Sequence, residues 1–112
     1  MSKTLTVKIM GVDWVVHLQS NTAYKRMHGS DSEGITYPGD REVYFNKDYF
    51  TPAVVRHELM HCYHASSPTS SSSLTADQKE EESCEIYAEH GPTMDMQVDQ
   101  IISFYARKHA LK

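Results

Sequence analysis

One stretch, residues 54–64 with the sequence VVRHELMHCYH, constrains this chain more than any other, because it repeats histidine at a helical spacing. His57 and His61 are four residues apart, and residues four apart on an α-helix lie one above the other on the same face. Both imidazoles can therefore point at one ion. Glu58 lies about 100° round the helix from His57, where it reaches a water on that ion without coordinating the ion itself. The pattern predicts a helix with two metal ligands and a general base.

The residues around this motif predict where its helix begins and ends. Thr51 belongs to a residue type that caps helix N-termini, and Pro52 suits the first helical position, where its missing N–H has no partner to lose. A Ser-Ser-Pro run at residues 66–68 is expected to stop the helix after about Ala65. The serine-rich segment that follows, residues 66–73, has the composition of an exposed loop.

Length and charge limit the classes of protein to consider. The chain has 112 residues, enough for one domain with one small core, and a net charge of −4. It has no dense cluster of Lys or Arg, so we expect no nucleic-acid partner. The uncharged runs are too short and polar for a bilayer, and residues 1–11 lack the apolar core of a secretory signal. We expect a cytoplasmic protein whose Cys62 and Cys84 are reduced thiols.

Two β-hairpins are predicted before the motif helix. Apolar residues alternate over residues 5–9 and recur over residues 14–18, with a glycine between the two runs. Residues 34–37 and 42–46 flank a Pro-Gly-Asp-Arg turn. Extended peptides bind by adding a strand to an exposed sheet edge, and one strand of the second hairpin, in particular residues 42–46, is a candidate edge.

Helices account for most of the remaining chain. Residues 21–27 predict a short helix capped by Ser20 or Asn21. A helix from Thr75 to about His90 is expected to end at Gly91 and Pro92, and a last helix to cover residues 93–109. The predicted fold class is α+β: a short antiparallel sheet packed on the motif helix and two further helices.

A catalytic zinc ion takes three protein ligands and keeps a fourth position open, so two histidines are not enough. Glutamates on the helix after the motif helix are candidates for the third ligand: Glu81, Glu82 and Glu85. His64 shares roughly the face of His57 and His61, but a ligand two turns along one helix is hard to bring onto a tetrahedral site. The residues alone leave these four candidates open.

Two motifs together, HELMH at residues 57–61 and EIYAE at residues 85–89, resemble the gluzincin pattern of zincin-like HExxH metallopeptidases. The resemblance covers roughly residues 34–91 and is greatest to small phage and bacterial members, including ImmA/IrrE-type and minimal gluzincins. It implies that Glu85 is the third ligand, that Ala88 lets the two helices approach, and that Glu89 hydrogen-bonds a ligand histidine.

The function implied by this resemblance is zinc-dependent peptide-bond hydrolysis by a single zincin-like domain spanning residues 1–112. His57, His61 and Glu85 would hold Zn²⁺, and Glu58 would activate a water to attack a peptide or protein substrate. Tyr63, Tyr105 and His109 are the candidates for the residue that stabilises the oxyanion.

The small size of the chain favours a second hypothesis, because it leaves little room for a substrate cleft. In this alternative the chain is a non-catalytic, zinc-bound interaction protein of phage origin that binds a host protein. Closure of the metal by four protein ligands, through His64 or a cysteine, would favour binding over catalysis.

Overall fold

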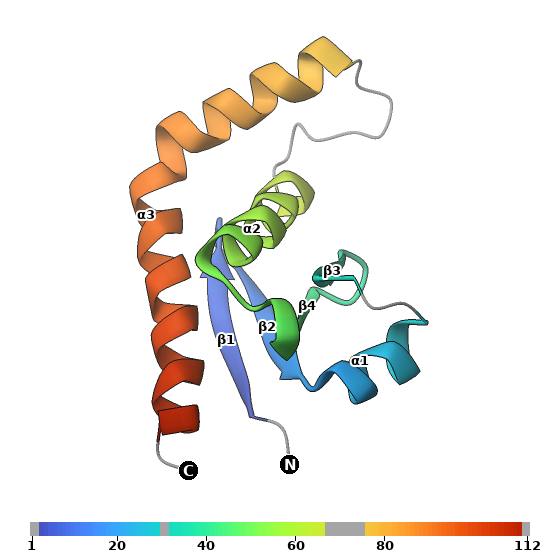
Figure 1. Cartoon of the computed structure of the whole chain (residues 1–112). Coiled ribbons are helices and arrows are strands. Elements are labelled where there is room, and N and C mark those ends of the chain that lie inside the picture. Colours follow the sequence, from blue (N-terminus) through green and yellow to red (C-terminus); the bar gives the residue numbers. More distant parts are fainter. Residues whose placement is uncertain (1–2, 30–31, 67–75, 111–112) are drawn as a thin grey trace.

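The computed structural model describes residues 3–29, 32–66 and 76–110, and the side chains of residues 76–80 and 107–110 are outside that description. Within these ranges the chain forms a four-stranded mixed sheet and three α-helices, which confirms the predicted α+β class (Figure 1). The elements are β1 (Thr4–Ile9), β2 (Val12–Gln19), α1 (Asn21–His28), β3 (Gly34–Tyr37), β4 (Glu42–Asn46), a 3-10 turn (Lys47–Tyr49), α2 (Pro52–Ser66) and α3 (Ala76–Ala110).

The two predicted hairpins are present, but they join in a way that the sequence did not predict. The strand order is β1-β2-β4-β3, and each hairpin is antiparallel. β2 and β4, however, pair in parallel, from Val15 opposite Glu42 to Gln19 opposite Asn46. The antiparallel pairing predicted within each hairpin is confirmed, and the sheet as a whole is mixed, because the second hairpin docks on β2 through its returning strand.

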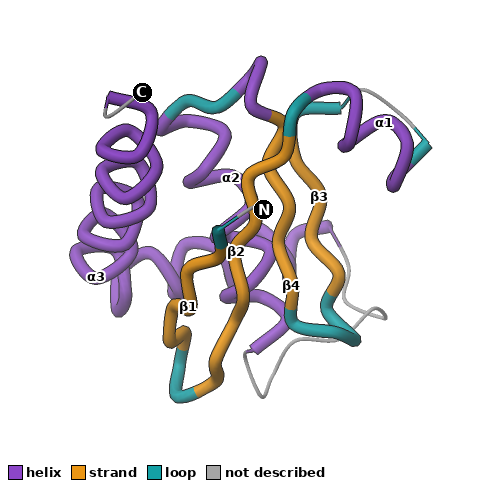
Figure 2. Tube along the Cα trace, turned by 90° about the horizontal axis from the view of Figure 1, so that it is seen from below, coloured by secondary structure: helices purple, strands orange, loops and turns teal. Residues whose placement is uncertain are grey.

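This strand order determines which strand is available at the edge beside the motif helix. β4, the strand of residues 42–46 that was the candidate substrate edge, lies inside the sheet between β2 and β3. β3 has a strand neighbour on one side only and contacts α2. Figure 2 shows the strands in this order, with α3 beside β1 and α1 near the other side of the sheet.

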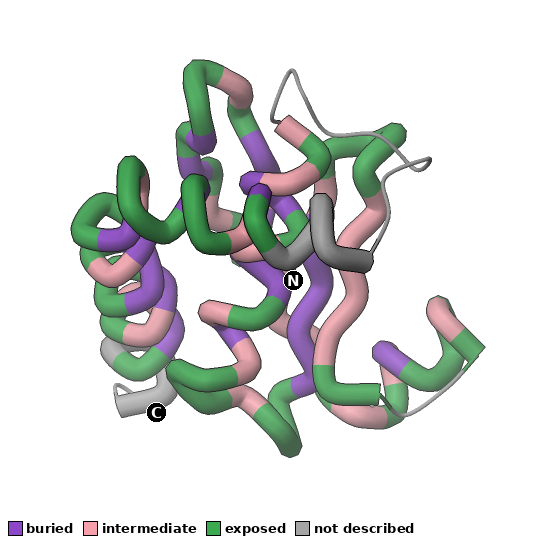
Figure 3. The backbone as a smooth tube through the Cα atoms, turned by 90° about the horizontal axis from the view of Figure 1, so that it is seen from above, coloured by how far each residue is buried: buried purple, intermediate pink, exposed green. Residues whose placement is uncertain are grey.

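The core lies between one face of the sheet and helices α2 and α3, where Figure 3 shows most of the buried chain. Alternate strand residues point into it, because successive side chains of a strand face opposite sides. The sheet contributes Val7, Ile9, Trp14, Val16, Val43 and Phe45, and the helices contribute Val55, Leu59, Cys62, Ile86, Met94, Val98, Ile101 and Tyr105, among others. α2 is thus held against the sheet by its apolar face, which leaves its polar face outward.

The opposite face of the sheet is packed against α1. Ser20 was one of the two predicted caps of this helix. Its side chain accepts a hydrogen bond from the backbone N–H of Ala23 at 3.2 Å, which confirms Ser20 as the cap. His28 of α1 lies against Tyr44 of β4, with ring centroids 4.7 Å apart. Burial, followed by the charge of His17, lowers the pKa of His28.

α3 is one continuous helix of 35 residues, so the predicted stop at Gly91 and Pro92 is wrong. A proline inside a helix removes one backbone hydrogen bond and bends the helix, and Figure 1 shows α3 bent. Gly91 is buried in this helix, and a Cβ there would make an ordinary contact of 3.4 Å with the Tyr87 ring. Thr75, the predicted cap, and residues 67–73 of the predicted loop lie outside the described residues.

Among the described helices, none has the length and apolarity needed to cross a membrane.

A buried polar link joins α2, α3 and β1. The Tyr63 hydroxyl donates to Gln97 Oε1 at 2.7 Å, and Gln97 Nε2 donates to the carbonyl oxygen of Lys8 at 2.8 Å. Burial raises the pKa of Tyr63, so its hydroxyl remains a donor. Because buried polar groups cost free energy unless they are paired, this link specifies how the motif helix sits between the sheet and α3.

Replacing Tyr63 by Phe should lower the free energy of unfolding by about 1–3 kcal/mol, because Gln97 Oε1 is then buried without its donor. Urea denaturation followed by circular dichroism measures this loss. Tyr87→Phe is the matched control, since Tyr87 is 52% exposed, and it should leave stability unchanged. Equal stabilities for the two variants would show that the buried link contributes nothing.

Candidate metal centre

α2 begins as predicted. The Thr51 side chain accepts from the backbone N–H of Val54 at 3.3 Å, and Pro52 is the first helical residue. Val55, Leu59 and Cys62 are fully buried on the side that faces the core. Since these residues fix the rotation of the helix, His57 and His61 are exposed on its outer side.

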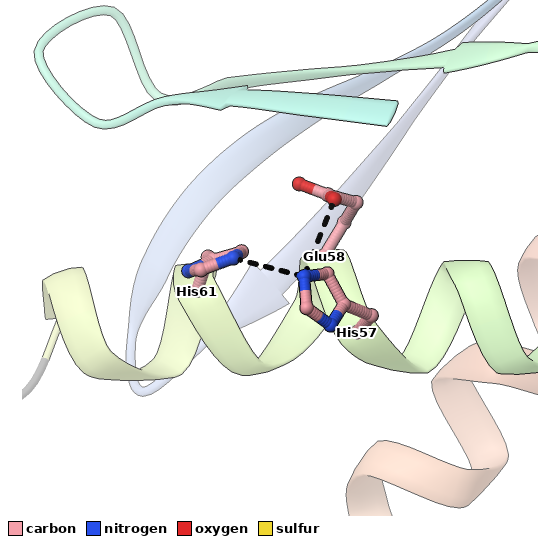
Figure 4. Close-up of side chains that lie close together, drawn as sticks. All are labelled: His57, Glu58 and His61. Carbon is pink, nitrogen blue, oxygen red and sulfur yellow. Dashed lines mark hydrogen bonds and ion pairs between the residues drawn. The ribbon is translucent and has the colours of Figure 1, made fainter. Parts of the chain in front are cut away.

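The two motif histidines point toward one another, as Figure 4 shows. Their Nε2 atoms are 3.2 Å apart, and 69% of the His57 side chain is exposed. Two imidazole nitrogens bound to one tetrahedral zinc ion, each at about 2.0–2.1 Å, are separated by about 3.3 Å. This separation is that of a hydrogen bond between the two rings, and it also matches the separation that a single tetrahedral ion requires.

The Glu58 side chain extends toward the sheet with one carboxylate oxygen on the side of His57 (Figure 4), and the residue is 6% exposed. Its Oε1 accepts a hydrogen bond from Thr36 Oγ1 of β3 at 2.7 Å, whereas its Oε2 lies 4.0 Å from His57 Nε2. Gly34, also on β3, leaves the space that the carboxylate arm occupies, because a Cβ there would lie 2.9 Å from Glu58 Cγ. One carboxylate oxygen is thus tied to β3, and the other faces the histidine pair.

Open space lies on both sides of these groups. One hollow of about 420 Å³ is lined by Ala53 and Val54 of α2 together with residues 32–34, and another of about 510 Å³ extends past Ile35 and Pro38. Both are bordered by Gly34, His57 and Glu58. An extended ligand lying between β3 and α2 would therefore pass over the histidine pair.

The third ligand predicted from the resemblance is not brought to the pair. In the described part of the chain, the group whose ligand atoms could share an ion consists of His57, Glu58 and His61, all within 4.8 Å of one another. Glu85 is exposed on α3 and lies outside this group. Coordination by Glu85 would require α3 to turn when a metal binds, so its role stays a prediction.

The alternative ligands are engaged elsewhere or exposed. Glu82 is buried, but its Oε1 lies 2.5 Å from His64 Nδ1, and the other ring nitrogen of His64 is 2.7 Å from Ser83 Oγ. This contact packs α3 against the end of α2. Glu81 is exposed, as are Ala88 and Glu89, the expected helix-packing residue and the expected partner of a ligand histidine. The Glu89 carboxylate is 3.7 Å from His90 Nε2.

Two of the three candidate oxyanion residues, Tyr63 and Tyr105, make hydrogen bonds away from the site. The Tyr63 hydroxyl is bonded to Gln97, and the Tyr105 hydroxyl donates to the carbonyl oxygens of Lys3 and Val16 at 3.0 Å each. Burial raises the pKa of Tyr105 to about 12. The His109 side chain lies outside the described residues.

Both cysteines are free thiols. Cys62 is fully buried beside Glu58, and burial followed by the charge of Glu58 raises the pKa of its thiol well above the usual value. Metal ligation needs the thiolate, so Cys62 is poorly suited to be a ligand. Cys84 is exposed on α3.

Thr36 and Gly34 are the site residues that the sequence did not indicate. They occupy alternate positions of β3, and this spacing puts them on one face of the strand. That face meets Glu58 only because β3 is the edge strand beside α2, and nothing local to residues 34–37 predicts such a contact.

Comparisons with protein-family models, with curated proteins and with solved structures found no match to this chain. The case for a metal centre therefore rests on its own residues. These are two exposed imidazoles at a tetrahedral spacing and a carboxylate held beside them.

Replacing either His57 or His61 by Ala should abolish tight binding of one zinc ion per chain, because a single imidazole remains. Isothermal titration with zinc chloride measures the affinity, and we expect a loss of at least about 100-fold. His17→Gln is the control, since His17 pairs with Glu42 away from the site. Unchanged zinc affinity in both alanine variants would remove the histidine pair as the metal centre.

The role predicted for Glu85 has its own test. If Glu85 is the third ligand, Glu85→Gln should weaken zinc binding by at least about tenfold, whereas Glu81→Gln, also exposed, should bind like the unaltered protein. Competition with a chromophoric chelator extends the measurement to tight affinities. Equal affinities for Glu85→Gln and the unaltered chain would exclude Glu85 as a ligand.

Proposed function

We propose that this protein is a zinc-dependent metallopeptidase of the gluzincin-like HExxH type. The observation that carries the proposal is the 3.2 Å separation of the His57 and His61 Nε2 atoms, with the free oxygen of Glu58 facing them. Two imidazoles and an adjacent carboxylate with one oxygen bonded to Thr36 are the parts that metal-assisted hydrolysis needs.

The histidine pair would hold the metal from α2, and the third protein ligand is predicted at Glu85. When bound, a zinc ion polarises the substrate carbonyl and lowers the pKa of a coordinated water to about 7. Because His57 and His61 are both exposed, solvent and substrate can reach a metal bound by them from outside the fold. This exposure supports an open coordination position.

Glu58 would act as the general base and then as the general acid. Its Oε2 takes a proton from the attacking water, whose oxygen bonds to the scissile carbonyl carbon. The same oxygen returns the proton to the leaving nitrogen as the C–N bond breaks, so that one water is consumed and a carboxylate and an amine are formed. The Oε1 atom, bonded to Thr36, remains an acceptor throughout.

A peptide substrate is supported by the position of β3. This strand is at the sheet edge and runs along α2, so an extended segment can pair with its free side and cross the histidine pair. Hollows on both sides leave space for substrate residues before and after the scissile bond. From the resemblance to small phage and bacterial gluzincins, we expect such an enzyme to act in the cytoplasm of a bacterial or phage-infected cell.

Glu58→Gln should keep zinc binding and lower the rate of peptide cleavage by roughly 10²–10⁴-fold, because the amide cannot accept the water proton. A quenched-fluorescent peptide library reports cleavage, and titration reports zinc. Asp99→Asn, which neutralises an exposed carboxylate on α3, is the control and should cleave at the rate of the unaltered protein.

Full activity in Glu58→Gln would refute the proposed mechanism. A protein that binds zinc through four protein ligands and cleaves no peptide in the library would instead support the alternative of a non-catalytic interaction protein.

A further inference from the structure

The orientation of the Glu58 side chain is set by residues of β3 and not by its own helix. Its side chain is 8% exposed, and a buried carboxylate is costly unless hydrogen-bond donors satisfy it. Thr36 Oγ1 of β3 supplies such a donor to Oε1 at 2.7 Å. The remaining oxygen, Oε2, is the one directed toward His57. The two oxygens of one carboxylate therefore have different surroundings.

The Thr36 hydroxyl has one proton to give, and at 2.7 Å it donates that proton to Glu58 Oε1. Cys62 lies one turn after Glu58 on α2 and is fully buried.

Gly34 restricts the conformation of the Glu58 side chain sterically. It lies two residues before Thr36, on the same face of β3, and a Cβ at this position would be 2.9 Å from Glu58 Cγ. The carboxylate arm therefore fits into the space left by the missing side chain. A contact at Gly34 and a hydrogen bond at Thr36 together hold Glu58 in one conformation.

We infer that Thr36 is a positioning residue, whose hydroxyl holds Glu58 Oε1 at the sheet edge so that Oε2 faces the side on which His57 and His61 would hold the metal and its water. This inference rests on the proposed function and deepens it, because the strand expected to bind the substrate would also orient the general base. A 1 Å displacement of a catalytic group can cost about 10²-fold in rate.

Valine has nearly the shape of threonine, so Thr36→Val removes the hydroxyl and little else. On the best-cleaved peptide from the fluorescent library, we expect kcat to fall about 10- to 100-fold. KM and zinc affinity should stay unchanged, since Thr36 is not placed to bind the metal. Thr36→Ser restores the hydroxyl and should return kcat close to the original value.

The matched control is Thr6→Val, the same substitution at an exposed position of β1, which should leave kcat unchanged. Full kcat in Thr36→Val would overturn the inference and leave the proposed function standing. A loss of zinc binding or of folding in Thr36→Val that accounts for the loss of activity would show a structural role, which also overturns it.

Crystal structures of the zinc-loaded unaltered protein and of Thr36→Val give a readout that does not depend on cleavage. We expect Glu58 Oε1 within hydrogen-bond distance of Thr36 Oγ1 in the first, and a turned or disordered carboxylate in the second. The same Glu58 conformation in both would overturn the inference. If the unaltered protein cleaves no peptide, the proposed function fails, and the crystal structures alone decide whether Thr36 orients Glu58.

Discussion

The hydrogen bond between Thr36 and Glu58 joins the two parts of the molecule on which the account depends. One partner lies on the edge strand and the other on the motif helix, 22 residues apart in sequence. Without it, Glu58 is a buried carboxylate next to two imidazoles and is free to turn toward any cation they bind. With it, one oxygen is held at the sheet, and the other lies 4.0 Å from His57 Nε2.

The strand order makes this bond possible. Because β2 and β4 pair in parallel, the second hairpin places β3 at the sheet edge and β4 inside. The apolar residues of α2 pack under the sheet and set the helix rotation, so Glu58 meets β3 while the histidines remain exposed. α3 completes the core from the other side of α2, and Tyr63 and Gln97 link the two helices.

Local signals predicted the parts of the fold that depend on local interactions. The start of α2 followed from Thr51 and Pro52, and the facing histidines followed from helical spacing alone. The parallel pairing of β2 with β4 depends on contacts distant in sequence, and Gly91 with Pro92 stopped no helix because packing along α3 outweighs the cost of one proline. The role of Thr36 was not predictable, since it depends on which strand reaches the edge, and the third ligand depends on the rotation of α3, which no local pattern specifies.

The central claim is that His57 and His61 hold a metal while Glu58 stays off it. Anomalous diffraction from crystals of the zinc-loaded protein, collected at the zinc edge, tests this most directly. We expect one peak about 2.0–2.1 Å from both Nε2 atoms, with Glu58 Oε1 still bonded to Thr36 and Oε2 beyond coordination distance. A peak with Glu58 bound directly to the metal, or one located away from the histidine pair, would contradict it.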